Sequence, residues 1–329
     1  MDLARRIGAH LPLAGGMVKA AERAYAIGAN ALQVFGDNPA AWRRRAAPPA
    51  ELPEFRDRLD AYDIQPLAVH AAYLINLAGP DEAFARRSLE VLGHELRSAE
   101  SFGARFLNVH AGSHRGTSLA EGIDRLATGV AQVIDSHGGS QGPMIVIENS
   151  GGGGFPVGAD LEDLERIAAA AAQRGVPEDR LGFCLDTAHL WAAGYPIDQP
   201  FEVDRLLDEF ERRVGLHRLA LVHLNDSKTA VGSHLDRHEH VGAGTIGERG
   251  LGHIVRHPRL AATTFIVETP GMDEGYDEVN VARALDLLAG RPLEALPPAA
   301  FEVRGSRSRA SGPTETTETA ETSRSSSRC

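Results

Sequence analysis

Eight short apolar runs recur along the chain. They occupy residues 7–10, 31–35, 66–70, 106–110, 144–148, 182–186, 219–223 and 264–268. Seven of them end in a histidine or a carboxylate, and only the second ends in an apolar residue, Phe35. From His110 the end residues follow at near-constant spacing, 38 residues to Glu148, 38 more to Asp186 and 37 more to His223. A strand, a helix and two loops need about 35–45 residues, so this spacing predicts repeated strand–helix units.

The stretches between the runs have the periodicity of helices. Apolar residues recur at three- and four-residue spacing over 81–102, 161–172 and 201–214, which predicts helices there. Residues typical of helix boundaries flank these stretches, namely Asp160, Pro200, Gly103, Gly175 and Gly215. Eight such units predict an α/β fold, a (β/α)8 or TIM barrel. Because all its strands point the same way, the polar residues at their ends should meet at the C-terminal mouth.

The end of the chain differs in composition from the rest. Residues 303–329 are mostly Ser, Thr, Arg, Glu and Gly, and they cannot bury enough apolar surface to offset their ordering entropy. We therefore expect one barrel domain over residues 1–302 and a disordered tail over 303–329. No apolar run is long enough to span a membrane, no signal peptide is recognisable, and Cys184 and Cys329 cannot form a disulfide framework. These features predict a cytoplasmic protein with no membrane association.

The net charge of the chain is −11. An acidic chain is a poor nonspecific partner for nucleic acid. Divalent ions bound at the mouth would nevertheless make that region locally positive. The charge therefore weighs against nonspecific nucleic-acid binding and leaves a specific site open.

Histidines and carboxylates cluster at and just beyond the expected strand ends. Asp186 and His189 lie three residues apart after the sixth run, and Asp236 and His238 form an Asp-x-His step after the seventh. Nitrogen and oxygen ligands without cysteine are typical of zinc, manganese or iron used in catalysis. Nine ligands exceed the need of one ion, and three ions that share carboxylates would use them all. The candidate ligands are His70, His110, Glu148, Asp186, His189, His223, Asp236, His238 and Glu268.

A structural interpretation competes for each of these residues taken alone. A histidine at a strand end commonly makes a structural hydrogen bond, and Glu148 or Asp186 could cap the helix that follows it. Seven polar strand ends favour a joint metal site, because charged groups at the ends of buried strands need partners or metals to offset desolvation. We expect His10 either to contact the metal ligands without being one or to be structural, and His253 and His257 to be solvated on an outer face.

Several short segments, taken in this order and at this spacing, resemble those of a known protein family. They are Ile7-Gly8-Ala9-His10, Tyr73-Leu74-Ile75-Asn76-Leu77-Ala78, His110-Ala111-Gly112-Ser113-His114, Ile147-Glu148-Asn149, Cys184-Leu185-Asp186-Thr187-Ala188-His189, His223-Leu224-Asn225-Asp226-Ser227-Lys228, Asp236-Arg237-His238 with Gly242-x-Gly244-x-Ile246-Gly247, and Glu268-Thr269. Together they resemble the endonuclease IV family of zinc-dependent apurinic/apyrimidinic (AP) endonucleases, which repair DNA. The resemblance covers most of the predicted barrel.

The resemblance implies a centre of three zinc ions, one of which manganese or iron could replace. By this analogy one ion is held by His70, His110 and Glu148, a second by Glu148, Asp186, His223 and Glu268, and the third by His189, Asp236 and His238. The catalytic carboxylates would be Glu148, Asp186 and Glu268. The nucleophile would be metal-activated water, whose pKa falls from about 15.7 to about 7. The implied reaction hydrolyses the phosphodiester 5′ to an abasic site, leaving a 3′-hydroxyl and a 5′-deoxyribose phosphate, with 3′-end trimming as a further activity.

The resemblance also implies contacts with damaged double-stranded DNA, and association with the nucleoid after damage. Tyr73 and Leu74 match the side chains that this family inserts into a bent duplex. The loop after the second run departs from the family, which usually has basic residues where this chain has Asp37 and Ala40. Replacement phosphate contacts could come from the next residues, Arg43, Arg44 and Arg45.

Two other classes of function stay open. A metal-dependent sugar isomerase or epimerase on a similar barrel would use one or two ions and would not need Asp236 and His238. A lesion-binding protein without turnover is suggested by the altered loop. A dinucleotide cofactor is not expected, because the glycines of residues 242–247 follow a charged loop rather than a strand, and a backbone contact with phosphate suits them better. We expect the protein to be a monomer.

Overall fold

The computed structural model of the chain describes residues 5–139 and 141–303. Of the expected tail only Val303 lies within this part, so the prediction for the remaining tail residues falls outside the described residues. No helix within the described ranges is long and apolar enough to cross a membrane.

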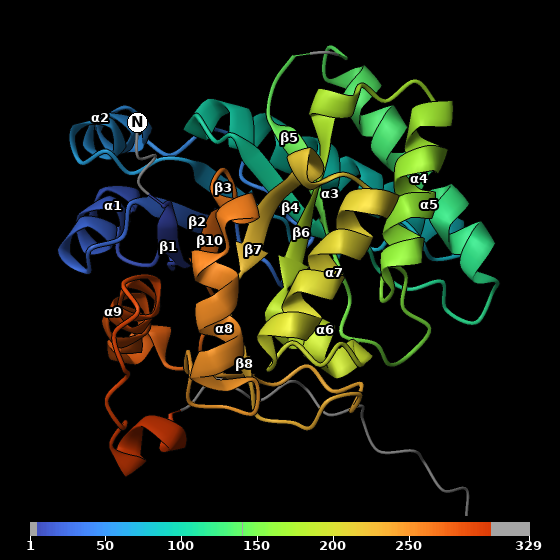
Figure 1. The fold of residues 1–329 in the computed structure, drawn as a ribbon. Helices are drawn as coiled ribbons and strands as arrows, with labels where there is room; N and C mark the ends of the chain where they lie inside the picture. Colours follow the sequence, from blue (N-terminus) through green and yellow to red (C-terminus); the bar gives the residue numbers. More distant parts are fainter. Residues whose placement is uncertain (1–4, 140, 304–329) are drawn as a thin grey trace, which may run out of the picture.

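Eight parallel strands close into a barrel with helices around its outside (Figure 1), which confirms the predicted fold. The strands follow one another around the barrel in chain order, and the first pairs with the last to close it. Every predicted run is a strand, and only three of the sixteen predicted ends differ, each by one residue. The strands are β1 (Ile7–His10), β2 (Ala31–Phe35), β3 (Leu67–His70), β4 (Phe106–His110), β5 (Met144–Glu148), β6 (Leu181–Asp186), β7 (Leu219–His223) and β10 (Thr264–Val267).

Helices connect successive strands, and a small hairpin interrupts the pattern after β7. The helices are α1 (Met17–Ala26), α2 (Leu52–Ala61), α3 (Glu82–Phe102), α4 (Leu119–Ser136), α5 (Leu161–Gln173), α6 (Thr187–Ala193), α7 (Pro200–Arg213), α8 (Gly247–Arg256) and α9 (Tyr276–Leu288). The hairpin pairs β8 (Asp226–Ser227) with β9 (His238–Glu239) in antiparallel fashion. Short 3-10 helices lie at Glu178–Arg180, Leu216–Arg218, Pro258–Leu260, Met272–Glu274 and Pro298–Glu302.

Helix α3 illustrates how the sequence sets the element boundaries. The Asp81 side chain accepts a hydrogen bond from the backbone N–H of Phe84, which caps the first turn. Gly103 ends the helix in the left-handed region with φ 76, a conformation that favours glycine. Leu92 and Leu96 are fully buried on its inner face. The helix begins one residue after the start of the predicted stretch and ends where predicted, just before the expected boundary residue Gly103.

Strands β1 and β2 approach each other closely at Gly8. A Cβ at Gly8 would be 2.0 Å from the carbonyl oxygen of Ala31, so only glycine fits there. In the register of this pair, His10 of β1 lies opposite Gln33 of β2. Both side chains are buried, and they bring polar groups into the C-terminal half of the barrel interior.

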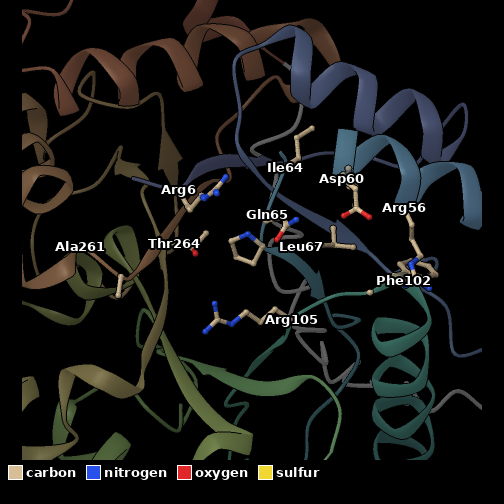
Figure 2. Close-up of a pocket in the computed structure, with 14 residues that line it drawn as sticks. Arg6, Arg56, Asp60, Ile64, Gln65, Leu67, Phe102, Arg105, Ala261 and Thr264 are labelled. Atoms are coloured by element: carbon tan, nitrogen blue, oxygen red, sulfur yellow. The ribbon is translucent and has the colours of Figure 1, made fainter. Parts of the chain in front are cut away.

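A hollow of about 520 Å³ lies at the opposite end of the barrel (Figure 2). It is lined by residues that precede or begin strands, among them Arg6, Leu67, Arg105 and Thr264. The ends of the strands that carry the predicted ligands face the other way, so this hollow is separate from the candidate metal centre.

Candidate metal centre

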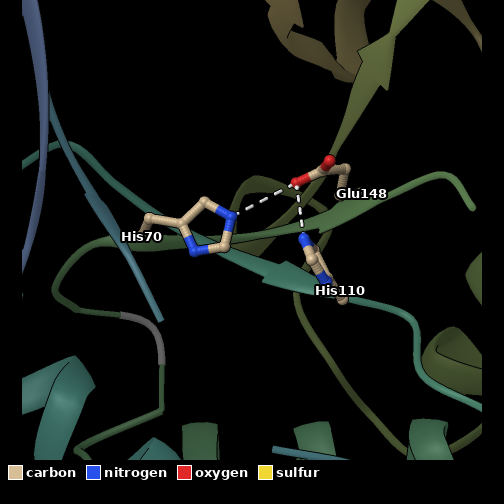
Figure 3. Close-up of side chains that lie close together, drawn as sticks. All are labelled: His70, His110 and Glu148. Carbon is tan, nitrogen blue, oxygen red and sulfur yellow. Dashed lines mark ion pairs between the residues drawn. The ribbon is translucent and has the colours of Figure 1, made fainter. Parts of the chain in front are cut away.

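His70, His110 and Glu148 come together at the ends of β3, β4 and β5 (Figure 3). Oε2 of Glu148 lies 3.5 Å from Nε2 of His70 and 3.6 Å from Nε2 of His110. The Glu148 side chain is 1% exposed, whereas that of His110 is 42% exposed. The group is therefore buried on the barrel side and opens to solvent at His110.

The second oxygen of Glu148 belongs to a neighbouring group. Oε1 lies 3.5 Å from Nδ1 of His223, and this nitrogen is 3.1 Å from Oε2 of Glu268 and 3.9 Å from Oδ2 of Asp186. One ligand atom from each of these four residues falls within 4.8 Å of the others. Glu148 thus joins two potential ion sites through its two oxygens.

His189, Asp236 and His238 form a third group beside the second. Oδ2 of Asp236 lies 3.3 Å from Nε2 of His189, and its Oδ1 lies 3.1 Å from Nε2 of His238. Nε2 of His238 is also 3.5 Å from Oδ2 of Asp186, which links this group to the second. The structure therefore brings all nine candidate ligands together at the mouth of the barrel, and which of them would share an ion stays a prediction.

Backbone carbonyls orient three of these imidazoles. Nδ1 of His70 donates to the carbonyl of Ala71 at 2.7 Å, and Nδ1 of His189 donates to that of Asn149 at 3.0 Å. Nδ1 of His238 donates to the carbonyl of Glu268 at 2.7 Å. With its proton on Nδ1, each ring presents the lone pair of Nε2 to the cluster, as metal-ligating histidines commonly do.

The donor set fits divalent cations. Oε1 of Glu148, Nδ1 of His223 and Nε2 of His238 are buried without a hydrogen-bond partner, although burying an unpaired polar atom is unfavourable. All three atoms point into the cluster. Imidazole nitrogen and carboxylate oxygen at such positions suit zinc, manganese or iron.

The histidines and carboxylates also shift one another's pKa values. Burial opposes the charged form of His238, but Asp186 and Asp236 outweigh burial and raise its pKa to about 10. Burial also opposes the charged forms of His189 and His223, yet both pKa values are raised. Asp186 and Asp236 raise that of His189, and Cys184, Glu268 and Glu148 raise that of His223. Without metal, protons on these rings would therefore balance the carboxylates.

We predict that the chelator-treated protein loses stability as the pH rises from about 7 to 9.5. A histidine whose pKa is raised stabilises the fold fully below its unfolded value of about 6.5, and this contribution is lost as the pH rises through the folded value. Urea denaturation at the two pH values would measure the change, and His238→Gln should reduce it. Equal stability at both pH values would contradict the prediction.

Sequence reasoning missed the amides that hold the carboxylates in place. Nδ2 of Asn108 donates to Oε2 of Glu148 at 2.6 Å, and Nδ2 of Asn225 donates to Oδ2 of Asp186 at 2.7 Å. Gln33 is a third such amide, in contact with Glu268. The available signal was the presence of Gln33 and Asn108 inside apolar strands. His10 is buried with its Nδ1 2.9 Å from Oε1 of Glu268, so it contacts a candidate ligand, one of the two roles expected of it.

Two expectations about other polar residues are wrong. His253 and His257 are not simply solvated, because their Nε2 atoms lie 2.7 Å and 3.2 Å from Oδ1 of Asp204, and His257 is 9% exposed. The 242–247 loop does not offer its amides to a phosphate. The N–H groups of Gly244, Ile246 and Gly247 instead donate to the buried carboxylate of Asp226. This carboxylate fixes the loop that follows the hairpin of β8 and β9.

The predicted DNA contacts differ in their accessibility. Tyr73 is 59% exposed at the mouth, where its ring centroid lies 6.1 Å from that of His110, and Leu74 is partly buried beside it. Arg43 is exposed. Arg44 is turned inward, with its side chain 7% exposed and NH1 3.1 Å from Oε1 of Glu95, so it is not free to reach a phosphate.

Arg45 contacts Asp37, one of the two residues that depart from the family pattern. Its backbone N–H donates to Asp37 at 2.6 Å, and its Nε lies 3.6 Å from the same oxygen. Its side chain stays 33% exposed. Of the three arginines, Arg43 and Arg45 therefore keep surface that DNA could contact.

Comparisons with known proteins agree with this architecture. The family model described as xylose isomerase-like TIM barrel matches residues 21–290. A probable endonuclease 4 of Halothermothrix orenii is 37% identical over 281 residues, which cover 84% of this chain and 99% of that protein. The crystal structure of endonuclease IV from Thermus thermophilus has a TM-score of 0.76 at 36% identity and covers 87% of this chain and 99% of that one. A D-tagatose 3-epimerase-like protein, at 15% identity and a TM-score of 0.61 over 86% and 98% of the two chains, is alike in fold alone.

The fold and the site define a class: a (β/α)8 barrel whose mouth carries clusters of histidines and carboxylates that could hold metal. Within this class, the chain belongs to the xylose isomerase-like TIM barrel family and, by its identity with the curated relatives over almost their whole length, to the endonuclease 4 proteins. The resemblance drawn from the sequence segments is thereby confirmed.

Proposed function

We propose that this protein is an AP endonuclease, a hydrolase that cuts the phosphodiester 5′ to an abasic site in double-stranded DNA and leaves a 3′-hydroxyl and a 5′-deoxyribose phosphate. The observation that carries the proposal is the third ligand group, His189, Asp236 and His238, next to the pair of groups joined by Glu148. The membership of this chain among the endonuclease 4 proteins supports the same reaction. Trimming of damaged 3′ ends would use the same site.

Zinc is the metal that we propose for the three groups. Divalent ions would supply Lewis-acid chemistry there, lowering the pKa of water and stabilising charge on phosphate oxygens. The chain itself orients the ligands: Asn108 and Asn225 each donate to a ligand carboxylate, and backbone carbonyls set three imidazoles. His110 and Asp236 are the most exposed of the candidate ligands, so we place the reacting phosphate on their side of the cluster.

Tyr73 would contact the DNA next to the reacting phosphate. It is exposed, and its ring packs edge-on against Phe35 with centroids 5.1 Å apart, close to His70 and His110. A rigid aromatic side chain in this place suits insertion beside a displaced sugar. Arg43 and Arg45 would contact the phosphate backbone from the loop after β2.

The direct test is incision of a duplex oligonucleotide with one stable abasic analogue. We expect a single cut 5′ to the analogue, an extendable 3′-hydroxyl, and loss of cutting after chelation that added zinc restores. An undamaged duplex of the same sequence is the control. Tight binding to the abasic duplex without any cut by the zinc-loaded protein would contradict the proposal and favour a lesion-binding protein.

A sugar isomerase or epimerase would not need the third ligand group, and this difference gives a second prediction. We expect the double variant Asp236→Ala/His238→Ala to lose incision by about 100-fold or more, since it removes ligands of an ion worth several kcal/mol of charge stabilisation. The matched control is Asp204→Ala/His253→Ala, which deletes an aspartate–histidine pair on the outer helices and should keep full activity. Incision assays on both variants make the comparison. Unchanged incision by Asp236→Ala/His238→Ala would show that the third ligand group is not needed for a nuclease reaction.

A further inference from the structure

Gln33 is a buried polar residue in the middle of strand β2, whose other side chains are apolar. Its exposed fraction is 0%. Its side chain reaches the second ligand group, where its Nε2 is 2.6 Å from Oε1 of Glu268 and its Oε1 is 3.2 Å from Nε2 of His223. A fully buried amide that contacts two ligands of one group can influence how both of them face an ion.

The contact with Glu268 determines which way the Gln33 amide points. A carboxylate only accepts hydrogen bonds, so the amide atom 2.6 Å from Glu268 must be the donating nitrogen. The reverse orientation would place two oxygens at that distance without a proton between them. The amide oxygen is therefore the atom that faces Nε2 of His223.

The orientation of the amide in turn determines the tautomer of His223. Because an amide oxygen only accepts, Nε2 of His223 carries the hydrogen, and the lone pair of a neutral ring is on Nδ1. Nδ1 is the atom that lies near Glu148, Asp186 and Glu268 and lacks a hydrogen-bond partner.

His223 is thereby set apart from the three histidines that backbone carbonyls orient. In His70, His189 and His238 the carbonyl bonds Nδ1 and leaves Nε2 for the cluster. In His223 it is Nε2 that is hydrogen-bonded and Nδ1 that is left for the cluster. The acceptor is the side chain of Gln33 rather than a backbone carbonyl. A substitution can remove this partner, whereas it cannot remove a carbonyl.

We propose that Gln33 is a positioning residue of the second ligand group, which holds His223 in the tautomer that ligates through Nδ1 and so sets the affinity of that group for its ion. The inference rests on the proposed metal centre. It predicts that an apolar side chain of similar volume at position 33 lets the ring populate the other tautomer. Loss of a partner that orients a ligand typically weakens metal binding by about 10–100-fold.

The test compares Gln33→Met with Gln33→Glu and with a control outside the centre. Gln33→Met keeps the volume and removes the side-chain hydrogen bonds to Glu268, His223 and His10, while Gln33→Glu keeps an acceptor toward His223. The control is Asn280→Leu, because Asn280 is also a fully buried amide bonded to an imidazole, that of His240, which is not one of the candidate ligands. Zinc affinity is measured by competition with a chelator, and the tautomer of His223 by nitrogen NMR of the zinc-loaded protein.

We expect Gln33→Met to bind one of its zinc ions about 10–100-fold more weakly and to lose the Nε2–H signal of His223. Gln33→Glu should retain that signal, and Asn280→Leu should keep wild-type zinc affinity even if it is less stable. Wild-type affinity and an unchanged signal in Gln33→Met would overturn the inference, as would an equal loss of affinity in Asn280→Leu. A wild-type protein that takes up no divalent ion would instead overturn the metal centre and the inference with it, so the two failures are distinguishable.

Discussion

Glu148→Gln is expected to abolish incision while leaving the barrel folded. Glu148 contributes one oxygen to the first ligand group and the other to the second, so its loss affects two ions at once. Each ion would stabilise the transition state by several kcal/mol, and at about 1.4 kcal/mol per tenfold change the rate should fall by about 1000-fold or more. The glutamine side chain has nearly the same shape as the glutamate that it replaces, and its amide oxygen can still accept the hydrogen bond from Asn108.

Metal content and activity together would separate this effect from misfolding. We expect the variant to retain fewer zinc ions per chain than the wild type, with an unchanged far-ultraviolet circular dichroism spectrum. Asp163→Asn is the matched control, because it neutralises another buried carboxylate on α5, away from the centre. Near-normal incision by Glu148→Gln would exclude a carboxylate shared between two ions.

The strands and ligands could be predicted because they follow a local rule. An apolar run that ends in one polar residue is unusual, and parallel strands of a barrel bring such ends to one mouth. His70 and Glu268 lie almost two hundred residues apart in the chain, yet topology alone predicts that they converge. The predicted strand ends needed correction by one residue at most.

Contacts between side chains of different elements could not be predicted in this way. The role of Gln33 depends on its distance to Glu268 and His223, which no spacing in the sequence encodes. The same holds for Asp226, a carboxylate in one of the segments that resemble the family, whose oxygens accept backbone N–H groups of a later loop. Neither the contacts of Gln33 nor those of Asp226 could be identified before the three-dimensional structure was known.

The loop after β2 is the clearest case of contacts that the sequence does not predict, since its three arginines look alike in the sequence. Arg44 lies against the buried carboxylate of Glu95 on α3 and also donates to the backbone carbonyls of Asn38 and Ala41. Trp42 packs edge-on against Phe84 of the same helix, with ring centroids 5.0 Å apart. These contacts fix the loop on α3 and leave Arg43 on its exposed side.

Burial raises the pKa of Glu95 to about 7 in spite of Arg44 beside it. The attraction between the two charges therefore does not fully offset the desolvation of the carboxylate, as is common for buried ion pairs. Such a pair can be replaced as a whole at little loss, but removal of one partner leaves the other charge buried. The two partners also differ, because a carboxyl can take up a proton at neutral pH and a guanidinium cannot lose one.

Glu95→Leu is consequently expected to destabilise the protein by about 3–5 kcal/mol, since it leaves the Arg44 guanidinium buried without its counter-charge. Arg44→Met should cost less, because the carboxyl of Glu95 can then stay protonated, and the double variant Arg44→Met/Glu95→Leu should recover most of the loss. Urea denaturation at pH 7 measures all three. Glu82→Leu is the control on the same helix: its pair with Arg86 is largely exposed, with side chains 91% and 68% accessible, and should contribute about 1 kcal/mol or less. If Glu95→Leu lost no more than Glu82→Leu, or if the double variant were as unstable as Glu95→Leu, the buried pair would not be what fixes this loop to α3.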